Sequence, residues 1–286
     1  MVSYASFLSF PLMSRMIYPC LWFDHQAAEA ADFYTSIFPK SKILEKSPIA
    51  VRFEVLGTPM MGLNGGPKYQ QTQASSYFVY CGTEVDIDEL YTSLLEGGKA
   101  IFPLGTYPWS PKYAWVTDRF GTNWQLDADP VRSAQKIVPC LLFVNENRSR
   151  AREAMEFYLG IFPKSTKLVE APHPDSEDLL FAQVNLEGYL INLMSSTETH
   201  DFGFCPGNSL VVPCEDQAEI DFFWKKLGEG GNYDRCGWLR DRFGHSWQVV
   251  PKDLGQWISD PQKGQKAINA LLKMEKLSID DLKNPS

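Results

Sequence analysis

The chain has 286 residues, 44% of them hydrophobic and 22% charged, a balance typical of a folded globular protein. Its formal net charge of -8 argues against nucleic acid or an anionic membrane surface as a partner, because either would repel the average field of the molecule. After the first residues, no stretch reaches the roughly 18 uninterrupted apolar residues that a membrane span requires.

Residues 1–16 are predicted to be an N-terminal extension. They are largely apolar, but no basic segment precedes the hydrophobic run and Pro11 interrupts it, which disfavours a signal peptide. Met16 stands directly before the first predicted strand, so either Met1 or Met16 can be the natural start. The six cysteines include no Cys-x-x-Cys pair, which indicates reduced, structural thiols and a cytoplasmic protein.

The first predicted elements are a strand, a helix and two strands. Ile17–Phe23 is a short apolar run bounded by a charged residue, as in a strand. Val51–Val55 alternates apolar and charged residues, and Met60–Leu63 supplies another apolar strand. Between the first two runs, apolar residues recur at helical spacing until Pro39 ends the helix. These residues are Ala30, Phe33, Tyr34 and Ile37.

The same order then begins again. Tyr77–Cys81 is predicted to be a strand, and the helical stripe that follows it ends at Gly97-Gly98. Two further strands, Tyr113–Val116 and Asn123–Leu126, are joined by the turn 118–121. The charged residues of this turn are most simply solvated hairpin residues, as are their later counterparts. They are Asp118, Arg119, Asp241 and Arg242.

Three blocks of this first half recur in the second half, with 20 of 30 positions identical. The pairs are Ile17–Asp24 with Ile137–Val144, Glu29–Ser41 with Glu153–Ser165, and Asp118–Leu126 with Asp241–Val249. Unrelated segments would agree at roughly one position in fifteen. The chain is therefore a tandem duplication.

We expect two domains, at residues 17–130 and 137–252, joined by a short polar linker at 132–136. A C-terminal helical tail, residues 253–286, follows them. Its first amphipathic helix has an apolar face. That face consists of Ala267, Ala270, Leu271 and Met274.

Several of these motifs together resemble the PhnB-like branch of the glyoxalase/bleomycin-resistance superfamily, also called vicinal oxygen chelate. Members of this branch often carry the label 3-demethylubiquinone-9 3-methyltransferase. The resemblance implies an α+β fold of tandem glyoxalase-like domains. Each would hold two paired βαβββ modules, with cupped mixed or antiparallel sheets around a small-molecule site. The motifs are Pro19–Phe23, Ala30–Tyr34, Gly97-Gly98, Tyr107–Trp109 and Asp118–Gln125.

In metal-dependent relatives, four side chains at the floor of the cup bind a divalent ion. The resemblance places these positions at Ile17, Met61, Ser76 and Gln125 in the first unit, and at Ile137, Asn192, Ser209 and Gln248 in the second. Transition ions prefer imidazole, carboxylate or thiolate donors, which these positions largely lack. We expect no metal and no other cofactor.

The methyltransferase label also lacks support in the sequence. S-adenosylmethionine enzymes of the usual kind have a glycine-rich turn after the first strand of a parallel sheet. The best glycine cluster here, at 64–67, instead precedes a Gln-rich loop. We therefore do not expect methyl transfer.

The segment between the glycine pair and the Asp-Arg-Phe-Gly turn differs between the units. It spans 20 residues from Lys99 to Asp118, but only 10 from Asn232 to Asp241. We expect the shorter segment to shrink the second cup. The longer one is rich in aromatics, which either line a pocket or close the end of the sheet. They are Phe102, Tyr107, Trp109 and Tyr113.

The ligand-binding residues predicted for the first unit are Gln125, Trp109, Tyr113, Ser76 and Tyr107. Gln125 can either bind a ligand carbonyl or be satisfied within the structure. The spacing of Ser, Cys, His and Asp residues identifies no catalytic constellation.

Three functional hypotheses remain open. The favoured one is metal-independent binding of a small, partly aromatic molecule in the first-unit cup, as in resistance-type relatives. The alternative is a metal-dependent lyase, isomerase or dioxygenase of the glyoxalase type, and the third is a structural duplicate without a site. The duplication also predicts either a monomeric pseudo-dimer or a homodimer.

Overall fold

The computed structural model describes residues 17–83, 85–128, 134–176 and 178–285. The predicted extension 1–16, the choice between Met1 and Met16, and part of the predicted linker lie outside these ranges. Within them, no helix is long and apolar enough to cross a membrane.

Four βαβββ modules follow one another along the chain. Module 1 comprises β1 (Tyr18–Phe23), α1 (Ala27–Ile37), β2 (Lys42–Lys46), β3 (Ala50–Val55) and β4 (Thr58–Asn64). Module 2 comprises β5 (Ser75–Tyr80), α2 (Ile87–Leu95), β6 (Lys99–Tyr107), β7 (Ser110–Thr117) and β8 (Asn123–Asp127).

Module 3 comprises β9 (Ile137–Phe143), the 3-10 helix η1 (Asn145–Arg150), α3 (Ala151–Ile161), β10 (Thr166–Pro172), β11 (Leu179–Leu186) and β12 (Tyr189–Ser195). Module 4 comprises β13 (Asn208–Cys214), α4 (Gln217–Leu227), β14 (Asn232–Tyr233), β15 (Trp238–Arg240) and β16 (Ser246–Pro251). The tail forms α5 (Leu254–Ile258), α6 (Gly264–Leu271) and α7 (Ile279–Lys283).

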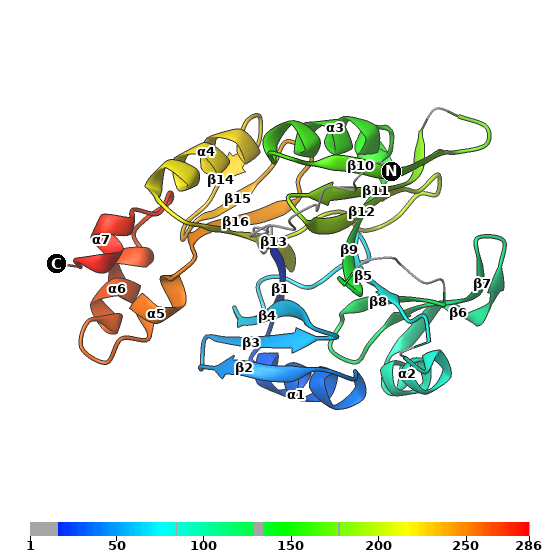
Figure 1. Ribbon diagram of the computed structural model, residues 1–286, viewed down its shortest axis with the longest axis horizontal. Coiled ribbons are helices and arrows are strands. Elements are labelled where there is room, and N and C mark those ends of the chain that lie inside the picture. Colours follow the sequence, from blue (N-terminus) through cyan, green and yellow to red (C-terminus); the bar gives the residue numbers. More distant parts are fainter. Residues whose placement is uncertain (1–16, 84, 129–133, 177, 286) are drawn as a thin grey trace, which may run out of the picture.

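The strands form two eight-stranded mixed sheets. Sheet 1 has the order β14-β15-β16-β13-β1-β4-β3-β2, and sheet 2 has the order β10-β11-β12-β9-β5-β8-β7-β6. Helices α1 and α2 lie along one side of the molecule, and α3 and α4 along the opposite side (Figure 1). This α+β architecture of paired βαβββ modules confirms the predicted fold class.

The structure corrects which modules share a sheet. Strand β1 pairs antiparallel with β13, and β5 with β9, so each sheet joins one module of the first repeat to one of the second. The two modules of a repeat meet instead through a common helix-side core. In the first repeat, Tyr34 of α1 and Leu94 of α2 belong to the same core. The prediction of a cup formed by the first unit alone is therefore wrong.

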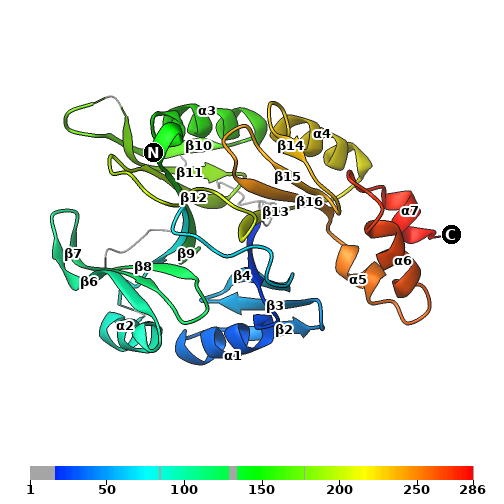
Figure 2. The same ribbon diagram turned by 180° about the vertical axis from the view of Figure 1, so that it is seen from behind.

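The concave face of each sheet is a separate layer. We call that of sheet 2 the hairpin cup, because β6 and β7 wall it, and that of sheet 1 the tail cup, because α5–α7 cover it. The hairpin and the tail helices lie at opposite ends of the molecule in both views (Figures 1 and 2).

Each repeat is tied together by a buried aspartate at the end of its last hairpin. Asp118 accepts hydrogen bonds from the Tyr34 hydroxyl and the Trp124 indole, both at 2.8 Å, and from the N–H groups of Phe120 and Thr122. Burial raises the pKa of its carboxyl, while the hydrogen bonds oppose that shift. The expectation that Asp118 is solvated is wrong, because it is 4% exposed.

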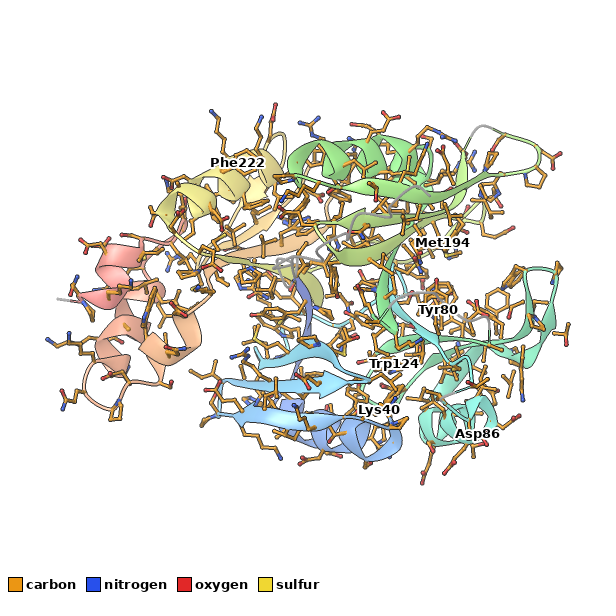
Figure 3. The ribbon with its side chains drawn as sticks, in the orientation of Figure 1. Lys40, Tyr80, Asp86, Trp124, Met194 and Phe222 are labelled. Atoms are coloured by element: carbon orange, nitrogen blue, oxygen red, sulfur yellow. The ribbon has the colours of Figure 1, made fainter. Side chains whose placement is uncertain are left out.

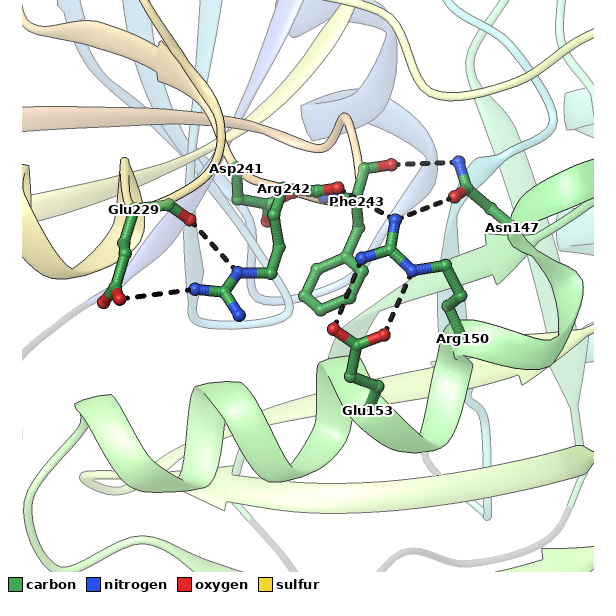
Figure 4. A network of polar contacts seen from close by, with 7 residues as sticks. All are labelled: Asn147, Arg150, Glu153, Glu229, Asp241, Arg242 and Phe243. Carbon is green, nitrogen blue, oxygen red and sulfur yellow. Dashed lines mark hydrogen bonds and ion pairs between the residues drawn. The ribbon is translucent and has the colours of Figure 1, made fainter.

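Asp241 repeats this arrangement, and its turn is further fixed to the start of α3. The Arg242 guanidinium lies 3.7 Å from the Glu229 carboxylate. Arg150 binds the Arg242 carbonyl at 3.0 Å and the Glu153 carboxylate at 3.0 Å (Figure 4). Arg242 is thus part of a structural network.

Candidate functional site

The floor of each cup contains four side chains at equivalent register positions. In sheet 1, Cys20 is paired with Met61 on one side and with Ser209 on the other. Gln248 of β16 donates a 3.0 Å hydrogen bond to the Ser209 hydroxyl. The equivalent floor of the hairpin cup consists of Cys140, Asn192, Ser76 and Gln125. The duplication therefore produces two related candidate sites.

The positions at which relatives hold a metal are divided between these floors. Ile17 and Ile137 lie in the helix-side cores instead, so their placement in a cup is wrong by one residue. Successive side chains of a strand point to opposite faces, and the next residues, Tyr18 and Val138, lie on the cup side.

The donor chemistry of the two floors does not fit a divalent transition ion. Each floor offers one thiol, which stays protonated because burial raises its pKa, and otherwise only thioether, hydroxyl or amide groups, whereas metal-dependent sites use imidazole and carboxylate donors. Across the described ranges, no cluster of three or more His, Cys, Asp or Glu residues could hold a metal ion.

A buried chain of polar side chains crosses the floor of the hairpin cup. The Tyr113 hydroxyl donates a short hydrogen bond to Gln125 Oε1, and Gln125 Nε2 donates to Ser76 Oγ at 2.7 Å. Gln125 is completely buried. Burial raises the pKa of Tyr113 far above its usual value, so its hydroxyl stays a neutral donor.

A second polar group faces the same cup. Gln183 and Asn192 both donate to the Tyr80 hydroxyl, at 3.3 Å and 3.1 Å. No group in the described ranges accepts a hydrogen bond from the Tyr80 hydroxyl. Burial raises the pKa of Tyr80, so the hydroxyl stays protonated and can donate. Tyr80 and Met194 both lie toward this cup, while Trp124 lies in the helix-side core (Figure 3).

The β6–β7 hairpin adds a wall of aromatic rings. Tyr107 stacks on Trp109 with 5.0 Å between ring centroids, and Phe102 lies parallel to Trp115 at 6.2 Å. Trp109 is 55% exposed and Phe102 37%. The indole N–H of Trp115 is buried without a hydrogen-bond partner in the described ranges. The wall therefore offers ring surface together with one unpaired donor.

All five predicted site residues lie on this one cup, which the fold brings together from β5, β6, β7, β8 and the turn between β6 and β7. Sequence patterns assigned no role to Tyr80, Trp115 and Gln183, and they indicated Asn192 only as a metal position. The alternation of β7 places Trp115 beside Tyr113 on one face. The pairing of β5 with β9, which adds Gln183 and Asn192, has no local signal.

The tail cup contains a cavity of about 620 Å³ between the β2–β3 hairpin, the sheet floor and helices α5 and α6. Met61 and Gln248 belong to both the floor and the cavity wall. The expectation that the shorter segment shrinks the cup on its side is wrong. A volume of this size is typical of small-molecule pockets.

The tail replaces the wall that module 4 lacks. Strands β14 and β15 have two and three residues, against nine and eight in β6 and β7. The N–H groups of Cys236 and Gly237 donate 2.8 Å hydrogen bonds to the carbonyls of Met274 and Glu275. Leu277 is completely buried in the cup. The tail is thus an integral part of the second candidate site.

Comparison with known proteins identifies relatives of each half. A family model described as 3-demethylubiquinone-9 3-methyltransferase matches residues 15–127 and again residues 135–250. The structure of glyoxalase I from Zea mays is 14% identical, with a TM-score of 0.58, over 84% of this chain and 92% of that one.

A PhnB protein from Bacillus cereus, described as a 3-demethylubiquinone-9 3-methyltransferase, is 34% identical over 38% of this chain and 95% of that one, with a TM-score of 0.35. No curated protein matches the sequence. The maize enzyme is similar in fold alone, because its identity is low.

Proposed function

The chain belongs to the 3-demethylubiquinone-9 3-methyltransferase family, as a tandem PhnB-like member of the glyoxalase/bleomycin-resistance superfamily, and on this premise we propose that it binds a small, partly aromatic molecule without a metal in the hairpin cup. The observation that carries the proposal is the unpaired, buried Trp115 indole N–H beside exposed rings.

The unpaired donors indicate the chemistry of the ligand. A buried donor without a partner costs about 1–3 kcal/mol, which an acceptor oxygen on a ligand would recover. Within the described ranges, neither Trp115 Nε1 nor the Tyr80 hydroxyl donates a hydrogen bond. We therefore expect a molecule with a carbonyl or similar oxygen attached to an aromatic ring.

The exposed rings of the hairpin supply the second half of the recognition. Trp109 and Tyr107, stacked on each other, offer a face and edges to an aromatic ligand. Tyr113, Gln125 and Ser76 form the floor beneath them. These five residues remain our proposed ligand-binding set, extended by Tyr80, Trp115 and Phe102.

We do not extend the methyltransferase activity in the family's description to this chain. A Cβ at Gly65 would lie 2.1 Å from the Trp22 ring, and Trp22 Nε1 donates to the Gly66 carbonyl at 2.7 Å. This glycine pair accommodates a tryptophan. Addition of S-adenosylmethionine should leave the thermal unfolding curve unchanged, and a clear rise in Tm would contradict the proposal.

The binding proposal is tested by titration with small aromatic ketones, with 4-hydroxyacetophenone as the first probe, followed by tryptophan fluorescence. We expect saturable binding that persists in EDTA. Phe102→Ala should weaken it about fivefold or more, since an aromatic contact contributes about 0.5–1.5 kcal/mol beyond buried area.

The matched control is Phe222→Ala, which removes another exposed phenylalanine, on α4. It should leave the affinity unchanged. Equal loss in both variants, or loss of binding in EDTA, would contradict metal-independent binding in the hairpin cup.

We further propose a monomer, because both cups are completed by modules of one chain. A stable dimer in light scattering would contradict this.

The ranges 17–130, 137–252 and 253–286 remain our proposed division into repeats and tail. None of the six cysteines, which all lie in the described ranges, forms a disulfide, which supports our proposal of a cytoplasmic protein.

A further inference from the structure

We propose that the tail cup is a second binding site, which takes an apolar molecule carrying one carboxylate and uses the C-terminal helices as one of its walls. This site goes beyond the aromatic ligand proposed for the hairpin cup. The two sites differ in wall, chemistry and position in the fold.

The walls of the cavity favour an aliphatic body. Leu254 and Ile258 of α5 and Ile268 of α6 face Met61 and Val211 of the sheet across it. Tyr18 is the single aromatic residue among those that line the cavity. Burial of aliphatic surface contributes about 25 cal/mol per Å², without the ring contacts that the hairpin cup offers.

The rim of the cavity is apolar and exposed. Leu44 of β2 is 42% exposed, and Ile49, between β2 and β3, is 49% exposed. Both residues line the cavity. Exposed apolar side chains gathered at the mouth of a pocket are typical of a ligand entrance.

Two donors at the polar end of the cavity suit a carboxylate. The Tyr18 hydroxyl has no hydrogen-bond partner in the described ranges, and burial raises its pKa to about 12, so it is a neutral donor. Arg52 lies near enough for its charge to oppose that shift. An arginine can bind a carboxylate through two parallel hydrogen bonds.

The ion pair that Arg52 forms with a neighbouring carboxylate is a loose one. Glu45 Oε2 lies 3.8 Å from Arg52 Nη1, longer than a hydrogen bond. Glu54 is 3.2 Å from the Lys42 ammonium, and Lys252 is paired with Glu215. A carboxylate can therefore approach Arg52 without displacing a tight ion pair.

The test is calorimetric titration of the full chain with decanoate and, as the neutral counterpart, decanol. We expect decanoate to bind more tightly than decanol. Arg52→Gln should weaken decanoate binding about tenfold, the effect of losing a hydrogen bond to a charged group, and leave decanol unchanged. Tyr18→Phe should weaken decanoate binding by a smaller factor, about threefold.

Two cavity-filling variants test the location. A Cβ at Gly255 meets no atom within 4 Å, so Gly255→Trp adds bulk to the lining without a backbone clash. Ile268→Trp does the same from α6. Both should abolish binding of decanoate and decanol while retaining the circular dichroism of the native chain. Trp109→Ala, in the hairpin cup, should change neither affinity.

Hydrogen exchange with decanoate locates the ligand directly. We expect decanoate to slow exchange in residues 254–271 and to leave the exchange rates of residues 99–117 unchanged. Failure of decanoate to bind, equal affinity in Arg52→Gln, or protection at 99–117 overturns this proposal. None of these outcomes bears on whether 4-hydroxyacetophenone binds the hairpin cup, so the two proposals fail separately.

Discussion

The hairpin cup and the tail cup have related floors but different walls. Each floor places a cysteine, a serine and a glutamine at the same register positions, with Asn192 in one and Met61 in the other. A long hairpin closes the first with aromatic rings, whereas helices from the end of the chain close the second with aliphatic side chains. The two repeats thus share the same floor and differ in their walls, and the walls determine what each cup can hold.

The largest expected effect concerns the tail wall. Leu277 is completely buried, in one apolar cluster with Cys20 and Val250, so Leu277→Ala should lower the free energy of unfolding by about 3 kcal/mol. Urea denaturation measures this. Leu272→Ala is the control, because Leu272 is 54% exposed and should cost less than about 0.5 kcal/mol. Similar losses in both would mean that the tail does not form a packed wall.

The next prediction is a loss of stability at acidic pH. It arises from a difference between the last hairpins of the two repeats, where His245 occupies the position equivalent to Thr122. Both ring nitrogens of His245 lack partners in the described ranges, and burial lowers its pKa from 6.5 to about 3. Below pH 6.5 the unfolded chain binds a proton that the folded one does not. Stability should therefore fall, by at most about 3 kcal/mol between pH 7 and 4.5.

The matched variant is His245→Thr, which copies the first repeat and retains Asp241. Burial raises the pKa of Asp241 to about 6, and this opposite contribution is common to both proteins. Urea midpoints at the two pH values should show a smaller acid loss in the variant. An identical loss in both proteins would show that His245 does not titrate as proposed.

A smaller effect compares the two floor glutamines. Gln125 bonds to both Tyr113 and Ser76, whereas Gln248 donates to Ser209. Gln125→Ala leaves two buried groups unpaired and should cost about 2 kcal/mol, against about 1 kcal/mol for Gln248→Ala. Denaturation of both variants decides the order, and a larger cost at Gln248 would contradict the described hydrogen bonds.

Much of the fold could be predicted because it is local. The helical stripe of α1 and the alternation of β3 each lie within a short segment, and the repeated blocks show that both halves share one design. The five predicted site residues also lie on one cup, since all five belong to module 2, which includes the β6–β7 hairpin.

The pairing of modules could not be predicted, because β1 (Tyr18–Phe23) pairs with β13 (Asn208–Cys214), which lies far along the chain, and no local pattern records that contact. Which residues of β1 point into the cup could not be predicted either. Residues 17–23 are apolar on both faces, so alternation does not separate Ile17 from Tyr18. The role of the tail depends on the same long-range arrangement.

The most direct test of two separate sites is a crossed titration of two variants with both probes. Trp109→Ala should lose affinity for 4-hydroxyacetophenone and retain that for decanoate, while Gly255→Trp should do the reverse. Calorimetry of the four combinations gives the answer. If either variant lost both ligands together, the cups would not be independent, and the proposal of two separate sites would be wrong.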